Sequence, residues 1–216
     1  MSDSVDAFLS TSEAIEALAQ FGNTFVFPNV ALAAEAIALK SLESVSMKSL
    51  IRKCPGGADI CRRWVIEGVS RMVKSTRYVI NQEQFDRLVR RTGMDLLRSW
   101  RDGFPSSHVR LSFGAAFRAV DLLFMAINES KTCRSGLIQS FLHVPLDRVT
   151  LRPLRLCIDE LVDRDFAIVI PAAVPTDFVA TEEQYVLLQE TIFALAEKAG
   201  VPPITYAYYC ASISSS

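Results

Sequence analysis

The chain has 216 residues, 50% of them hydrophobic and 22% charged, and its formal net charge at pH 7 is −1. An apolar fraction of this size can fill a core, which excludes intrinsic disorder, and the length predicts one domain over residues 1–216. The longest apolar stretch is interrupted by charged residues, so no membrane-spanning helix is expected.

Capping and breaking residues divide the first part of the chain. Ser10 predicts the start of a helix that stops near Gly22, and residues 24–27 are expected to be extended. Asn29 is expected to cap a second, Ala-rich helix. Residues 1–57 are thus predicted to form a helical N-terminal part or cap.

The middle of the chain contains the two clearest helices. The first is predicted over residues 58–74. The second is predicted over 82–102 with Asn81 as its N-cap, because apolar residues recur there every three or four positions. Gly93 lies inside the second helix and is expected to lower its helicity.

Positive charge is concentrated in this middle part. Residues 48–110 contain 14 Lys and Arg residues, 11 of them Arg, against six acidic residues. A segment rich in arginine suits contacts to phosphates, because a guanidinium can bind two phosphate oxygens at once. The alternative is a set of solvated helix faces with local ion pairs.

Two further helices are expected after residue 110. Ser112 is predicted to cap a strongly apolar helix. Asp147 precedes a helix predicted over 149–162, in which Pro153 fits only the first turn. Residues 166–170 are β-branched and apolar, which predicts a short strand or extended segment.

The end of the chain contains one more clear helix. Thr181 and Gln184 form a capping box, and Gly200 marks the C-terminus of the helix that they open. Residues 204–209 are expected as a short strand or a helical turn, and residues 211–216 as a frayed tail. The predicted fold is therefore mainly α, with a helical core over 58–210 and a few short extended segments.

Strong catalytic motifs are absent from the sequence. There is no phosphate-binding glycine loop, paired Cys-x-x-Cys or His-Glu-x-x-His motif, so no metal and no cofactor is expected. The five cysteines lack the spacing of a disulfide framework, and the acidic N-terminus lacks the basic start of a signal peptide. Both features indicate a cytoplasmic protein with reduced thiols.

A winged-helix domain is one interpretation of residues 137–174. Its recognition helix would be 151–162 and its wing 166–174. Acidic residues at Asp159, Glu160 and Asp163 make that helix a poor face for phosphates.

A resemblance to a known family favours a different interpretation. The segments SFGAAFRAVDLL from Ser112 and VPLDRVTL from Val144 are similar to a pattern in uncharacterised bacterial proteins that resemble helix-hairpin-helix 8-oxoguanine DNA glycosylases, especially the compact archaeal type. That pattern is an aromatic-Gly-x-x-x-Lys helix followed, after a spacer, by a Pro-x-Asp-Arg turn that starts a helix. The resemblance extends over roughly residues 80–210 and implies a helix-hairpin-helix glycosylase-like fold, double-stranded DNA as the partner and a role in DNA repair.

The same resemblance implies two catalytic positions. Asp147 matches the catalytic aspartate, whose carboxylate would stabilise the positive charge that develops on the sugar as the N-glycosidic bond breaks. Arg118 stands where the family has its catalytic lysine. A guanidinium stays protonated and cannot form a Schiff base, so hydrolysis without lyase activity is expected.

Contacts to DNA are also implied, although the paired glycines of the family's hairpin are absent. The residues expected to contact DNA are Arg91, Arg98, Arg101, His108, Arg110, Ser112, Gly114 and Arg148. The residues expected at a base pocket are Phe104 and His143.

Alternatives without catalysis fit the same residues. Asp147 can be an N-cap residue only, and Arg118 can pair with Asp121 or with Asp147 as a structural ion pair. The chain would then be a helical nucleic-acid-binding or protein-assembly module.

Overall fold

The computed structural model describes residues 10–30, 33, 36, 39, 54, 56–104, 110–130, 138–155, 157, 168–175 and 178–214. Within these residues the chain forms seven α-helices and one 3-10 helix. No strand occurs among them, and a single isolated β-bridge joins Val30 to Ser130. The predicted mainly α class is confirmed, whereas the extended segments that the sequence predicted are not strands where they are described.

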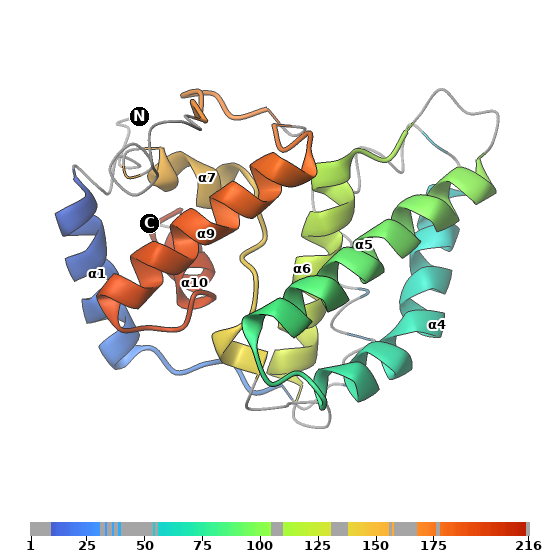
Figure 1. Ribbon diagram of the computed structural model, residues 1–216, viewed down its shortest axis with the longest axis horizontal. Helices are drawn as coiled ribbons and strands as arrows, with labels where there is room; N and C mark the ends of the chain where they lie inside the picture. The colour runs from blue at the N-terminus through green and yellow to red at the C-terminus, as the bar shows by residue number, and fades with distance from the viewer. Residues whose placement is uncertain are drawn as a thin grey trace. The chain divides into compact units, whose positions relative to one another are not determined.

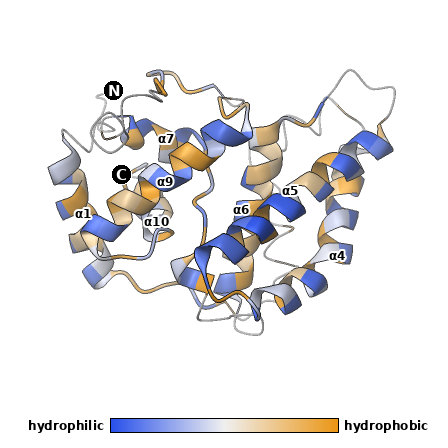
Figure 2. Cartoon of the chain, in the orientation of Figure 1, coloured by the Kyte–Doolittle hydropathy of each residue, from blue (hydrophilic) through white to orange (hydrophobic). Residues whose placement is uncertain are grey.

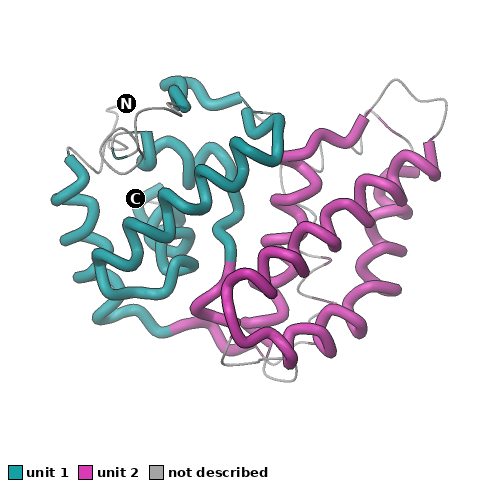
Figure 3. Tube along the Cα trace, viewed as in Figure 1, with its two compact units in different colours: residues 1–26, 143–216 teal, residues 27–142 magenta. Residues whose placement is uncertain are grey.

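Two compact units make up the chain (Figure 3). Unit 1 combines residues 1–26 with residues 143–216, and unit 2 is the continuous segment 27–142. Neither boundary falls at residue 57, where the N-terminal part was expected to end. That the two units fold together as one domain stays a prediction.

Unit 2 is built around three long helices, α4 (Gly57–Thr76), α5 (Gln82–Gly103) and α6 (Phe113–Glu129), with the 3-10 helix η1 (Ile138–Ser140). Helix α5 packs against both α4 and α6 (Figure 1). The expected apolar stripes form the core. Its fully buried large side chains include Phe85, Leu96, Phe117, Leu123, Phe124 and Ile127.

Local sequence explains where these helices begin. The side chain of Asn81 accepts a hydrogen bond from Gln84 N at the start of α5, and Ser112 Oγ accepts one from Ala115 N at the start of α6. Each bond satisfies an N–H group that the first helical turn leaves without a partner. The predictions of both N-caps are confirmed.

The described helices of unit 1 are α1 (Thr11–Thr24), α7 (Arg148–Leu154), α9 (Glu182–Ala199) and α10 (Thr205–Ser214). Helix α1 packs against α9 and α10, and α10 packs against α7. Thr181 as N-cap and Gly200 as the end of α9 are confirmed, because Thr181 accepts a hydrogen bond from Gln184 N and Gly200 is left-handed with φ 69°. The predicted capping box is only half formed, because the Gln184 side chain accepts from Ala180 N at 2.9 Å and not from Thr181 N.

Several predicted boundaries in unit 1 are wrong. Helix α1 continues past Gly22 to Thr24. Helix α7 ends at Leu154, and Pro153 lies in its second turn, where it removes only its own N–H from the helix. The piece over residues 204–209 was left open as strand or helix, and all of it but Ile204 belongs to α10, which continues through part of the expected frayed tail to Ser214.

Other sequence predictions fall partly outside the described residues. These include the second helix expected after Asn29 and the elements predicted within residues 158–167. The described part of the expected wing, residues 168–174, contains no strand, which does not favour the winged-helix interpretation. None of the described helices is long and apolar enough to cross a membrane.

Candidate nucleic-acid interface

Five arginines of α5 share one side of the helix, here called the arginine face. All are exposed; they are Arg87, Arg90, Arg91, Arg98 and Arg101. At 3.6 residues per turn their positions fall within an arc of about 100° around the helix axis. Three residues of the DNA-binding prediction, Arg91, Arg98 and Arg101, are therefore on the same face.

The arginine face lies opposite the buried stripe of the same helix. Phe85, Val89, Leu96 and Trp100 form that stripe and pack into the core of unit 2. In the hydropathy colouring α5 is mainly hydrophilic and α6 mainly apolar (Figure 2). Because the stripe fixes the rotation of α5, the arginines are held facing solvent.

Two ion pairs involving this face are exposed. Arg87 pairs with Glu83, and Arg101 Nε lies 3.7 Å from Asp102 Oδ1. Arg91 and Arg98 have no ion-pair partner among the described residues. Exposed pairs of this kind contribute little to stability, so phosphate groups can compete for the paired guanidinium groups.

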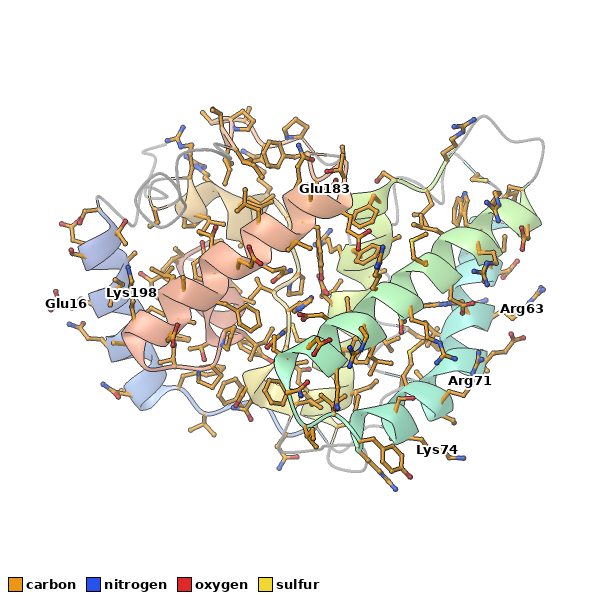
Figure 4. The ribbon with its side chains drawn as sticks, viewed as in Figure 1. Glu16, Arg63, Arg71, Lys74, Glu183 and Lys198 are labelled. Atoms are coloured by element: carbon orange, nitrogen blue, oxygen red, sulfur yellow. The ribbon has the colours of Figure 1, made fainter. Side chains whose placement is uncertain are left out.

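Helix α4 adds more positive charge to unit 2. Arg63, Arg71 and Lys74 line its outer edge and point away from the protein (Figure 4). Arg62 is also exposed but pairs with Asp59 at 3.3 Å. The segment 57–104 contains ten Lys and Arg residues against six acidic residues, so the surface formed by α4 and α5 is basic overall.

Three described residues of the DNA-binding prediction lie at or near the start of α6. Arg110 is exposed, as a phosphate contact requires. Ser112 uses its hydroxyl to cap the helix, and Gly114 is half-buried in the first turn. His108 lies outside the described residues.

Asp147 is the N-cap of α7 in unit 1. Its Oδ1 accepts hydrogen bonds from Val149 N at 2.8 Å and Thr150 N at 3.1 Å. Thr150 Oγ1 in turn accepts a hydrogen bond from Asp147 N at 2.9 Å, which completes a capping box. The carboxylate is half-buried, and the neighbouring Arg148, predicted to contact DNA, is exposed.

The extended chain before Asp147 is held by buried polar side chains. Gln189 of α9 bonds to both backbone groups of Val144, accepting from its N–H at 2.9 Å and donating to its carbonyl at 2.8 Å. Thr150 Oγ1 donates to Pro145 O at 2.9 Å, and Tyr206 Oη donates to Thr150 O at 2.8 Å. Asp147 is therefore attached to a rigid part of unit 1.

Arg118 lies in the middle of α6 and is half-buried. Asp121, one of its two predicted partners, is on the same helix and only 1% exposed. Arg118 belongs to unit 2 and Asp147 to unit 1. The predicted pair between these two residues stays a prediction.

The two predicted base-pocket residues are engaged in packing. His143 is 7% exposed, and its Nδ1 lies 2.8 Å from Tyr185 Oη. Phe104 is half-buried after the end of α5, with its ring 5.2 Å from that of Trp100.

One residue that suits nucleic-acid contact was missed from the sequence. Tyr78, in the turn between α4 and α5, is 80% exposed. No other aromatic side chain among the described residues reaches the exposed class. A single tyrosine between Arg77 and Val79 has no periodic signal, so only the structure reveals it.

Neither a metal site nor a similar known protein points to a function. No group of three or more His, Cys, Asp or Glu side chains suited to a metal ion occurs in the described ranges. The chain matches no protein-family model, no curated protein and no solved structure.

Proposed function

We propose that the protein binds DNA, with the arginine face of α5 contacting the phosphate backbone. The observation that carries the proposal is the placement of five exposed arginines within an arc of about 100°, opposite the buried stripe. Arginine binds phosphate through two parallel hydrogen bonds, and such contacts supply most of the affinity of non-specific binding.

The dimensions of the face suit a nucleic-acid backbone. Arg87 and Arg101 are 14 residues apart, which corresponds to about 21 Å along a helix with a rise of 1.5 Å per residue. Successive phosphates of one strand rise about 3.4 Å along the axis of double-stranded DNA, so this length matches roughly six base pairs. The outer edge of α4 and Arg110 extend the positive charge beyond α5.

The salt dependence of binding tests this part of the proposal. Fluorescence anisotropy with a labelled duplex should give a plot of log affinity against log salt with a negative slope. Changing Arg91 and Arg98 to Gln should make the slope less negative by about one per arginine. The matched control is Lys198→Gln on α9, which should leave the slope unchanged. Absence of binding at low salt contradicts the proposal.

The finer proposal is hydrolysis of an N-glycosidic bond in a damaged or modified base. Asp147 would stabilise the developing charge on the sugar, which is the role that the resemblance implies. Its support in the structure is the anchoring of Asp147 by the capping box and by Gln189, since a catalytic carboxylate must be fixed in place. Arg118 would interact with the substrate as a cation and not as a nucleophile.

Duplexes that carry oxidised or deaminated bases test the reaction. The expected product is an abasic site, without strand cleavage and without a borohydride-trapped adduct. Asp147→Asn should abolish product formation, because the amide cannot stabilise the sugar cation as a carboxylate does. Full activity of this variant contradicts the catalytic assignment.

A non-catalytic module is the second candidate function. The observation that favours it is the complete capping box, which accounts for Asp147 without any chemistry. In that case salt-dependent DNA binding remains and no damaged base is released.

A further inference from the structure

The turn between α4 and α5 projects two apolar side chains into solvent. Tyr78 is 80% exposed and Ile80 is 69% exposed, whereas Val79 between them is 3% exposed. Val79 therefore anchors the turn in the core of unit 2 while its two neighbours face outward. Single exposed apolar side chains are ordinary in folded proteins, but here two of them lie together in one short turn.

Hydrogen bonds hold this turn in a defined shape. Tyr78 N donates to Ser75 O at 3.1 Å, and Val79 N donates to Thr76 O at 3.3 Å. On the other side, Ile80 N donates to Gln84 Oε1 at 3.0 Å, and Gln84 N donates to Asn81 Oδ1 at 3.0 Å. A contact made by Tyr78 would therefore involve little loss of backbone entropy.

The charged side chains that precede the turn are positive, and Glu83, which is exposed in the first turn of α5 after it, is paired with Arg87. Arg71, Lys74 and Arg77 are all exposed, and no acidic residue occurs between Glu67 and Glu83. None of these three cations has an ion-pair partner among the described residues. A partner for this surface must therefore combine negative charge with a flat apolar group.

We propose that Tyr78 stacks on an unpaired nucleobase while Arg71, Lys74 and Arg77 bind the flanking phosphates. The ligand class is single-stranded DNA, or duplex DNA with an unpaired base. This inference rests on the proposed DNA binding and adds a preference among DNA structures that the arginine face alone does not supply.

Nucleic acid suits the turn better than an acidic peptide does. Every base has a π-face, and stacking on an aromatic side chain contributes binding energy with any sequence. Bases in an intact duplex are stacked on each other and unavailable, whereas an unpaired base exposes both faces. Ile80 adds apolar contact next to the ring.

Binding of two probes to the full chain tests the inference. The probes are a labelled 12-nucleotide single strand and the fully paired duplex of the same sequence. Tyr78→Ala should weaken single-strand binding by about tenfold, within the range measured for loss of one stacked base, and should change duplex binding by less than about twofold. Tyr78→Phe is the matched control, because it keeps the ring face and removes only the hydroxyl.

A spectroscopic measurement separates stacking from a change in charge or folding. Trp64 and Trp100 are both buried, so the Tyr78→Trp variant adds one solvent-exposed indole to two shielded ones. Addition of single-stranded DNA should quench the added fluorescence, and addition of an acidic peptide should not. Circular dichroism of each variant should match that of the native chain, since Tyr78 is outside the core.

The outcomes distinguish this inference from the proposed function. The stacking role alone is overturned if Tyr78→Ala binds each probe as tightly as the native chain does, while the change of Arg91 and Arg98 still lowers the affinity. If the native chain binds the acidic peptide and Tyr78→Ala does not, the stacking role is overturned in favour of a protein partner. If neither probe binds at low salt, the proposed DNA binding itself fails.

Discussion

Gly93 of α5 lies directly against the ring of Phe117 of α6. A Cβ atom at Gly93 would be 2.6 Å from Phe117 Cε2, which is closer than a carbon contact allows. Gly93→Ala should destabilise the protein by about 1–3 kcal/mol, because overpacking outweighs the gain of about 1 kcal/mol in helix propensity. Urea unfolding followed by circular dichroism would measure the change.

Gly68→Ala in α4 is the control for this prediction. A Cβ there would lie 2.7 Å from Met72 Cε, the flexible end of a side chain that can move aside. We expect this variant to be clearly more stable than Gly93→Ala. Equal losses in the two variants would mean that the ring of Phe117 is not what excludes a side chain at residue 93.

Gln189 should be one of the most sensitive positions of unit 1. Gln189→Leu leaves the N–H and the carbonyl of the buried Val144 without their partners. Each unsatisfied buried group costs about 1–3 kcal/mol, so a loss of roughly 3 kcal/mol is expected. Gln20→Leu on the exposed side of α1 is the control and should change the unfolding free energy by less than about 0.5 kcal/mol. A similar, small effect of both variants would contradict the anchoring role of Gln189.

Two substitutions at Asp147 separate its structural role from its proposed catalytic role. Asparagine caps helices about as well as aspartate, so Asp147→Asn should leave stability nearly unchanged. Asp147→Ala removes the cap of α7 and should cost about 1 kcal/mol. A catalytic aspartate requires that both variants lose base excision, although only the second loses stability. Thermal unfolding and the excision assay on the same preparations measure both properties.

Buried thiols make stability decrease at high pH. Burial raises the pKa of Cys61 to about 11 and the pKa of Cys210 to about 12, from an ordinary value of 9.0. Below pH 9 both thiols hold their protons in the folded and the unfolded chain. Above pH 9 the unfolded chain releases protons that the folded chain keeps, so the free energy of unfolding should fall as pH rises toward 11.

The urea midpoint measured from pH 8 to pH 10.5 tests this prediction. In Cys210→Ala the midpoint should fall less steeply with pH. The remaining fall is due to Cys61 and to Tyr206 and Tyr209, whose pKa values burial also raises. A midpoint that stays constant or rises over this range would contradict the assignment.

Periodicity and capping residues were enough to predict most of the helices. Helices α4, α5, α6 and α9 begin at or next to the predicted residues, because each has a long amphipathic or apolar pattern and all but α4 have a side-chain cap. Helix α10 could not be assigned in advance, since its start is a short run of tyrosines and alanine between a Pro-Pro pair and a polar tail. Its packing against α1, α7 and α9 stabilises it as a helix.

The candidate interface was only partly predictable from the sequence. The spacing of the arginines in α5 already implied one exposed face. The exposure of Tyr78 depends on the direction in which the turn leaves α4, which no local pattern encodes. The bond between His143 and Tyr185 joins residues 42 positions apart, so no local pattern could predict it.

The discontinuous course of unit 1 has a consequence for biosynthesis. Helix α1 packs against α9 and α10, yet the whole of unit 2 is translated between them. At about 5–20 residues per second, α1 waits on the order of 10 s for these partners to leave the ribosome. During this time the apolar side chains of Ala14 and Leu18 have no core to enter, so the nascent N-terminal helix is a natural site for chaperone binding.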